Sequence, residues 1–332
     1  MKDKKRYVII LTALAMLFVV LDAKTAIQGG QDGIMLCLRT VIPSLFPFIF
    51  LSGIIVNYAE QFSLPFLRPV CKLLGIPKGN ESLLFISIIG GYPIGAQAIY
   101  TAYKNGNLSR ENAHRLLGFC NNAGPAFIFG MGAVLFPTPL LCWVAWGIHI
   151  VSALLVGTFL PHKHYELSQS SIKQLKSIPK ILEESVKTMG IISGWVILFR
   201  VLIFILNRWV LWVLPAEISL WIIGILELTN GCSYIQAIPD TAWKFIIFCT
   251  LLGFGGICVG IQTKSVTREL NTGLYFPGKL LQGLLSFLFS FLIFYWNRLP
   301  VSPVLFPVIL AAVIIALLIK RNRGSILSKN SI

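Results

Sequence analysis

Long apolar runs separated by short polar stretches dominate the chain. The ten apolar segments are 7–21, 36–58, 83–103, 116–136, 139–160, 189–213, 218–238, 244–262, 277–296 and 302–319. Most of them reach or approach the roughly 20 apolar residues that a helix needs to cross a bilayer. The pattern therefore predicts an all-α polytopic membrane protein.

Glycine and proline interrupt several of these segments. The first interruption is Ile88-Ile-Gly-Gly-Tyr-Pro-Ile-Gly95, and Phe119-Cys-Asn-Asn-Ala-Gly-Pro125 opens the next apolar segment. Both residue types break helices, and an unsatisfied backbone group in hydrocarbon is costly. Broken helices at membrane depth survive only where they are buried in protein or line a wet cavity. When both halves of a membrane protein carry them, they indicate a transport site.

The basic residues predict a topology with re-entrant hairpins at 83–103 and 218–238 and eight crossings. With the N-terminus in the cytoplasm, 22 of the 28 lysines and arginines then lie in cytoplasmic segments, as the positive-inside rule requires. These segments are 2–6, 59–82, 104–115, 161–188, 263–279 and 320–332. Both chain ends are cytoplasmic in this arrangement. The alternative in which both hairpins cross the membrane completely stays open. Two extra crossings return the chain after residue 240 to the same side of the membrane, so charge alone does not exclude it.

Composition supports a membrane protein over a nucleic-acid binder. The chain is 56% hydrophobic and 12% charged, with a mean hydropathy of +0.78. The net charge of +15 fits basic cytoplasmic loops, so no nucleic-acid partner is expected. Segment 7–21 is short and follows basic residues, which also suits a signal peptide. Because Asp22 and Lys24 follow it directly, we interpret it as an uncleaved first span.

The two halves of the chain echo each other in opposite orientation. Gly90–Gly95 falls where Glu227–Gly231 falls, and Leu117–Gly124 falls where Leu252–Cys258 falls. One half starts outside and the other inside, which predicts inverted repeats, a transporter architecture. Chance recurrence of glycine-rich kinks is the alternative. The single membrane domain 1–332 is thus divided into an N-terminal extra helix (7–21), repeat 1 (36–160), a cytoplasmic amphipathic linker (161–188), repeat 2 (189–296) and a C-terminal extra helix (302–319).

Residues at the interruptions are the candidates for substrate binding. They are Gly90, Gly91, Tyr92, Pro93, Gly95, Asn121, Asn122, Gly124, Pro125, Glu227, Thr229, Asn230, Gly231, Gly255 and Gly256. The asparagine amides can bind carboxylates, polar rings or nucleobase edges without a charge cost. Helices that restart after a break aim free N–H groups into the cavity, and such helix N-termini attract anions. Tyr92 could stack on an aromatic ligand, with core packing as the alternative.

Glu227 is the only acid deep in an apolar segment. Intramembrane ionisable residues are expensive and point to function, with a partner of opposite charge. Arg200, in the middle of segment 189–213, is the predicted partner in a structural ion pair. A direct role of Glu227 toward substrate or a proton is the equal alternative.

The sequence carries no recognisable catalytic or cofactor motif. The seven cysteines are scattered without a CxxC pair, and the four histidines form no metal set with acids. The glycine-rich stretches lack the Gly-Lys-Ser/Thr of an ATP-binding loop. We therefore expect no enzyme activity, no cofactor and no metal site.

Three of these motifs together carry a family resemblance. Gly90-Gly-Tyr-Pro-Ile-Gly-Ala96, Leu116-Leu-Gly-Phe-Cys-Asn-Asn-Ala-Gly-Pro125 and Glu227-Leu-Thr-Asn-Gly231 resemble the nucleoside-recognition (Gate) domain membrane proteins, above all the sporulation integral membrane proteins of the YlbJ type. The likeness covers about residues 35–295. It implies an inverted-repeat transporter in the bacterial cytoplasmic or forespore membrane. The sporulation branch is implicated in moving dipicolinate, a small aromatic dicarboxylate, and the wider group is similar to concentrative nucleoside transporters.

The expected function is transport of a small organic solute, with an anionic aromatic such as dipicolinate as the first candidate. A nucleoside is the alternative substrate. A non-transporting membrane scaffold or signalling subunit of a sporulation complex is the alternative from another class. The expected partners are membrane lipids, the small-molecule substrate and a coupling proton or sodium ion, and a homo-oligomer stays open.

Overall fold

The computed structural model describes residues 2–58, 64–161 and 175–295. Within these ranges all regular structure is helical, which confirms the all-α class. Four helical stretches are long and apolar enough to cross a membrane, namely Pro139–Phe159, Ile178–Trp209, Thr241–Thr267 and Tyr275–Tyr295. The bent pair Thr12–Leu21 and Ala23–Val41 makes a fifth if it is counted as one span. The predicted helix 302–319 lies outside the described residues.

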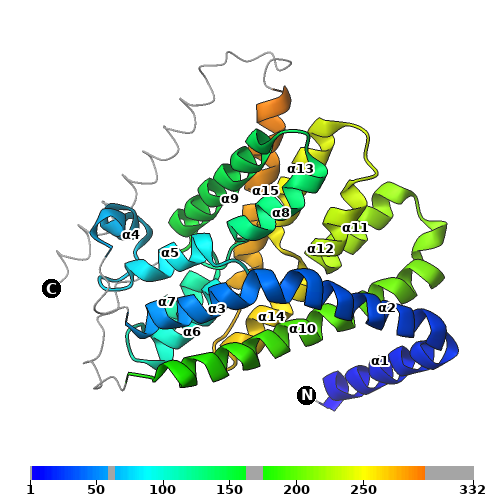
Figure 1. The fold of residues 1–332 in the computed structure, drawn as a ribbon, viewed down its shortest axis with the longest axis horizontal. Coiled ribbons are helices and arrows are strands. Elements are labelled where there is room, and N and C mark those ends of the chain that lie inside the picture. The colour runs from blue at the N-terminus through cyan, green and yellow to red at the C-terminus, as the bar shows by residue number, and fades with distance from the viewer. Residues whose placement is uncertain (1, 59–63, 162–174, 296–332) are drawn as a thin grey trace.

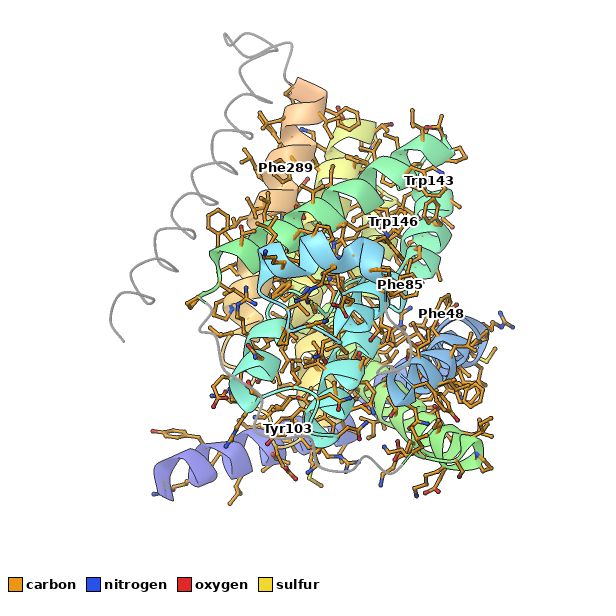
Figure 2. The ribbon with its side chains drawn as sticks, turned by 90° about the vertical axis from the view of Figure 1, so that its left-hand side faces the viewer. Phe48, Phe85, Tyr103, Trp143, Trp146 and Phe289 are labelled. Carbon is orange, nitrogen blue, oxygen red and sulfur yellow. The ribbon has the colours of Figure 1, made fainter. Side chains whose placement is uncertain are left out.

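The helices form two groups that lie one above the other in Figure 1. The lower group contains α10 (Ile178–Trp209), with α2 (Ala23–Leu36) and α3 (Ile42–Asn57) following one another along it and α1 (Lys2–Leu21) at its end. The upper group contains α8 (Pro125–Leu135), α9 (Pro139–Phe159), α13 (Thr241–Phe254) and α15 (Tyr275–Tyr295). In Figure 2, Trp143, Trp146 and Phe289 lie toward one end and Tyr103 toward the other.

Short helices complete the fold. They are the π-helical turn η1 (Cys37–Val41), the 3-10 turn η2 (Pro65–Leu67), α4 (Arg68–Leu74), α5 (Glu81–Ile89), α6 (Ile94–Lys104), α7 (Arg110–Leu117), the 3-10 turn η3 (Leu211–Val213), α11 (Ala216–Leu226), α12 (Leu228–Ile235) and α14 (Gly256–Thr267). Four predicted segments, 83–103, 116–136, 218–238 and 244–262, are each divided in two by a break. In both halves two broken helix pairs precede one unbroken helix, α9 or α15. The inverted orientation of the halves and the re-entrant path of the hairpins stay predictions.

Two boundaries differ from the sequence expectation. Residues 22–35, which no predicted segment covers, form α2, with Asp22 capping its N-terminus through the Thr25 N–H at 3.3 Å. Residues 178–188, predicted as part of the amphipathic linker, are the first turns of α10. The apolar side chains Leu182 and Val186 of the predicted amphipathic linker are exposed on these turns. The helix continues through the predicted boundary, because its one proline, Pro179, lies in the first turn, where proline is tolerated.

Helix α2 packs on α10 through two glycines one turn apart. A Cβ on Gly29 would lie 3.0 Å from the Cα of Val201, and one on Gly33 would lie 3.0 Å from the Cα of Ile197. Small residues at this four-residue spacing let membrane helices approach at backbone distance. The Gly-x-x-x-Gly spacing of Gly29 and Gly33 is a sequence signal from which α2 could have been predicted.

Gly29→Ala should therefore destabilise the α2–α10 packing, whereas Gly30→Ala should not. A methyl group at position 29 meets backbone and should cost about 1–2 kcal/mol as overpacking. A Cβ at position 30 meets only a methyl of Val201 at 3.8 Å and should be neutral or slightly favourable in a helix. Thermal melts of the two purified variants in detergent compare them directly. Equal melting temperatures would contradict this packing.

Candidate functional site

The breaks of the first half cross each other at backbone distance. A Cβ on Gly124, just before α8, would lie 2.9 Å from both the Cα and the nitrogen of Gly91, just before α6. A Cβ on Gly95 would overlap the carbonyl oxygen of Cys120. Gly91 has φ +85°, which a side chain would strain. Glycine is therefore required at these positions, because the two chain segments cross at backbone distance.

The breaks of the second half cross in the same manner. A Cβ on Gly231 in α12 would overlap the Cα of Gly224 in α11, and one on Gly256 would lie 3.3 Å from the Leu228 nitrogen. Gly255 and Gly256 have φ of +79° and +85°. In each half, the break of the first broken helix pair therefore packs against the break of the second pair.

Tyr92 joins the two crossings. Its hydroxyl donates to the carbonyl oxygen of Leu252 at 2.9 Å, and its ring lies 3.1 Å from the position of a Cβ on Gly255. Asn121 makes a second link, because its Oδ1 accepts from the Ala96 N–H at 3.2 Å and its Nδ2 donates to Thr263 Oγ1 at 2.9 Å. The structure therefore brings all four predicted interruptions together in one buried region.

Lys279 lies in this region and is fully buried. Its Nζ donates to Gln282 Oε1 at 2.6 Å, to Asn122 Oδ1 at 3.1 Å and to Tyr92 Oη at 3.5 Å. The ammonium also stands 5.1 Å from the centre of the Tyr92 ring, within cation–π range. No carboxylate among the described residues pairs with it. The site thus holds a buried lysine amine surrounded by neutral oxygens and one aromatic face.

Lys279 was not among the predicted site residues and was counted in the basic segment 263–279. It lies one turn inside α15 and is fully buried, so it is not a loop residue. A signal was available in the sequence. Lys279, Gln282, Ser286 and Ser290 follow one another at helical spacing, and all four are fully buried. A polar stripe along an otherwise apolar membrane helix marks the face that turns toward protein.

Gln282 and His149 extend the network to α9. The Gln282 amide donates to Asn122 Oδ1 at 3.0 Å and to the His149 carbonyl oxygen at 3.2 Å. His149 Nε2 accepts from the Ala123 N–H at 2.9 Å, so this nitrogen carries no proton. Asn122 is held by a further bond from its Nδ2 to the Phe119 carbonyl oxygen at 2.8 Å. The network fixes the break before α8 against α9 and α15.

The predicted Arg200–Glu227 ion pair is wrong, because each residue has another partner. The Glu227 carboxylate caps α12, accepting from the N–H groups of Thr229 at 3.0 Å and Asn230 at 2.7 Å, and from Asn230 Nδ2 at 2.8 Å. Arg200 instead forms an ion pair with Asp32 of α2. The sequence analysis left Asp32 out, since no predicted segment covered α2.

Two helix N-termini in the region have no side-chain cap. Gly124 precedes α8 and Gly255 precedes α14, and neither helix start receives a side-chain hydrogen bond. Free N–H groups and the helix dipole make such ends positive by about half a charge. They add to the positive charge of Lys279, whereas the α12 N-terminus is already neutralised by Glu227.

The chain is similar to the sporulation integral membrane protein YlbJ of Bacillus subtilis (strain 168). The two are 25% identical over 85% of this chain and 80% of that protein. No family model and no solved structure matches the chain. The likeness to a sporulation membrane protein is thus confirmed at the level of this relative, and the Gate domain stays a prediction. Together with its apolar helices, this marks the chain as a multi-pass membrane protein.

The reassigned ion pair gives a prediction for stability. Arg200 and Asp32 are only partly exposed, so the coupling energy in an Asp32→Asn and Arg200→Met double-mutant cycle should be about 1 kcal/mol. The matched cycle with Glu227→Gln in place of Asp32→Asn should show additive effects within about 0.5 kcal/mol. Unfolding of the purified variants in a detergent titration measures both cycles. Coupling confined to the Glu227 cycle would restore the original assignment.

Proposed function

We propose that the protein transports a small organic anion across the membrane, and that Lys279 is the charge that binds it. The observation that carries the proposal is the full burial of this lysine among neutral oxygens. Insertion scales give about 2.5–3.5 kcal/mol for a charged lysine at the centre of a membrane helix. Lys279 lies near the start of α15, but its full burial likewise removes it from water. Its neutral partners offset only part of that cost. A carboxylate of the substrate would supply the missing counter-charge.

The surroundings of Lys279 favour an anion over a nucleoside. The uncapped starts of α8 and α14 add positive potential at the same crossings. Recognition of ribose hydroxyls would favour a free carboxylate, and both oxygens of Glu227 are already engaged at α12. The face of Tyr92 offers stacking area beside the ammonium. An aromatic carboxylate such as dipicolinate combines the two features.

Transport would need the site to open, since Lys279, Asn121 and Gln282 are fully buried. The broken pairs provide short half-helices whose ends are joined by breaks of one to seven residues, such as Gly255 between α13 and α14. Movement of these half-helices about the crossings would expose the ammonium to one side and then the other, as in alternating access. The incoming carboxylate would replace Asn122 and Gln282 as the acceptor of the Lys279 protons.

Uptake by proteoliposomes containing the full-length protein tests the proposal. Labelled dipicolinate and labelled uridine are compared side by side, each with a proton gradient, a sodium gradient or neither. We expect saturable dipicolinate uptake above that of empty vesicles, and no uridine uptake. Uridine uptake alone would support the nucleoside alternative. Uptake of neither solute would favour a scaffold or signalling subunit.

A further inference from the structure

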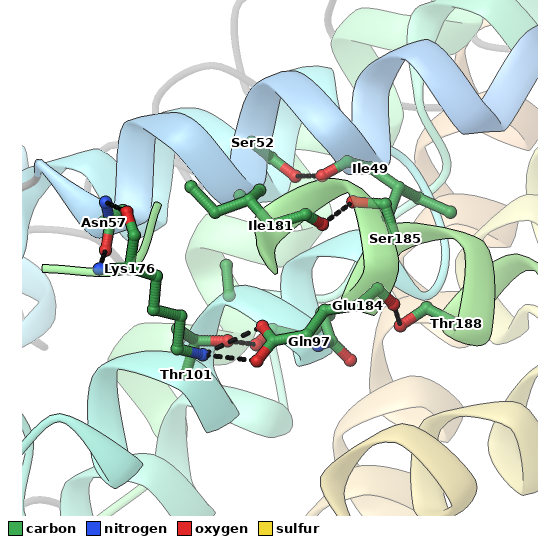
Figure 3. A pocket seen from close by; sticks show the side chains of 12 residues that line it. Ile49, Ser52, Asn57, Gln97, Thr101, Lys176, Ile181, Glu184, Ser185 and Thr188 are labelled. Atoms are coloured by element: carbon green, nitrogen blue, oxygen red, sulfur yellow. Dashed lines mark hydrogen bonds and ion pairs between the residues drawn. The ribbon is translucent and has the colours of Figure 1, made fainter. Parts of the chain in front are cut away.

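A polar cleft of about 300 Å³ opens between α6, α10 and α14. It continues into a narrower pocket between α3, α6 and α10, shown in Figure 3, and the two share Gln97, Thr101, Lys176, Glu184 and Thr188. We call the two together the basic vestibule. By the distribution of basic residues along the chain, it lies on the predicted cytoplasmic side.

The basic vestibule carries five cationic side chains and two acidic ones. Three of the cations are paired: Lys176 with Glu184 at 2.8 Å, Lys180 with Glu183 at 2.9 Å, and Lys104 with Glu269, just outside the vestibule, at 3.1 Å. The remaining two, Lys187 and Arg268, have no carboxylate partner within the described ranges. Two free cations that line one cleft favour a ligand with two negative charges.

Arg268 is held in an unusual backbone conformation. It has φ +46°, the one described non-glycine residue with positive φ. Contacts on its C-terminal side fix the turn that holds it. Glu269 pairs with Lys104, and the Asn271 N–H donates to His114 Nε2 at 3.0 Å. Strain of this kind persists where the surrounding structure enforces it, and it gathers at ligand-binding sites.

The vestibule and the crossed breaks share two helices, α6 and α14. Gln97 lines it and directly follows Ala96, whose N–H is bound by Asn121. Ser265 lines it and lies two residues after Thr263, which accepts the other Asn121 bond. Helices α6 and α14 therefore contribute residues both to the vestibule and to the Asn121 contacts beside the crossed breaks.

We infer that the basic vestibule binds a small dianion, held by Lys187 and Arg268, before the dianion moves on to Lys279. This inference rests on the proposed transport function and names the charge class of its substrate. A dicarboxylate should engage both free cations, and a monocarboxylate only one. The vestibule would be the cytoplasmic access of the transporter.

Site-directed labelling tests occupancy without any transport. All seven native cysteines are buried, so Thr101→Cys adds one accessible thiol inside the vestibule, and Lys264→Cys adds one on α14 outside it. Dipicolinate (pyridine-2,6-dicarboxylate) should slow maleimide labelling of Thr101→Cys about fivefold or more. The monocarboxylate pyridine-2-carboxylate should slow it clearly less. Labelling of Lys264→Cys should be unchanged. No protection of Thr101→Cys, or equal protection by both acids, would overturn the inference.

A second experiment removes the two unpaired charges of the vestibule. The double variant Lys187→Gln with Arg268→Gln should raise the KM for pyridine-2,6-dicarboxylate uptake about tenfold at low salt, with kcat kept. The difference should shrink at about 1 M salt, where screening acts within about 3 Å. The control Lys264→Gln, on α14 and outside the vestibule, should match the parent. A parental KM in the double variant would overturn the vestibule and leave the proposed function standing.

Two further outcomes separate the inference from its alternatives. Protection of Thr101→Cys by the dicarboxylate without uptake in vesicles would support the vestibule and contradict the transport function. An anionic lipid headgroup is another source of negative charge for the same cations. Protection that arises only in nanodiscs with anionic lipid, and not from the dicarboxylate in detergent, would overturn the inference.

Discussion

Replacing Lys279 with methionine should abolish anion transport and leave the protein as stable as the parent, or more so. Methionine keeps the length of the side chain and removes the charge, together with the desolvation cost of a buried ammonium. Without the amine, Gln282 Oε1 and Asn122 Oδ1 each lose one hydrogen-bond donor. Each lost bond should cost about 1 kcal/mol, which opposes the stability gained by removing the buried charge. We therefore expect a melting temperature at or above that of the parent.

The expected effect on transport is large. A buried ion pair that loses one partner costs about 3–5 kcal/mol, which corresponds to a loss of affinity of about a hundredfold or more. Uptake of dipicolinate into proteoliposomes and thermal melts in detergent are measured on the same preparations. The control is Lys264→Met, because Lys264 is exposed on α14 and should tolerate the change. Normal uptake by Lys279→Met would show that the lysine has no part in transport.

Gly95→Ala should destabilise the protein strongly, by about 3 kcal/mol. The added methyl group would overlap the Cys120 carbonyl oxygen and press on the Asn121 Cα at 3.1 Å. Both are backbone atoms at a crossing of two breaks, so neither can turn away as a flexible side chain can. The shift would also disturb Asn121, which links α6 to α14.

A matched control separates this clash from a general effect of alanine. Gly147 in α9 has no atom within 4 Å of the position of a Cβ, so Gly147→Ala should be neutral or stabilising by up to about 1 kcal/mol. Detergent-titration unfolding of both variants measures the difference. If Gly95→Ala were as stable as Gly147→Ala, the crossing of the breaks would be wrong.

The breaks themselves were predictable because their signal is local. Glycine, proline and polar residues clustered within an apolar run mark a helix break, so Gly90–Gly95, Asn121–Pro125 and Glu227–Gly231 could be located from the sequence. That these breaks touch one another depends on tertiary packing, and the internal repeat suggested it only indirectly. The tightness of the contacts, as between Gly91 and Gly124, explains the choice of glycine.

The charged partners were not predictable in the same way. Arg200 was assigned to Glu227 because both looked isolated, but its carboxylate comes from α2, a helix too polar to stand out as apolar. Glu227 satisfies a local need instead, the free N–H groups at the start of α12. Lys279 was misplaced because it lies near a helix end, where basic residues usually face the cytoplasm. Its burial follows from packing against α9 and the first crossing.

The most direct test of the central claim is binding of dipicolinate to the purified full-length protein in detergent. Isothermal titration at low salt is run on the parent, on Lys279→Met and on Lys264→Met. If Lys279 is the charge that binds the substrate, the parent and Lys264→Met should bind one dipicolinate with similar affinity, and Lys279→Met should bind about a hundredfold more weakly or not at all. Equal binding by the parent and Lys279→Met would contradict the account.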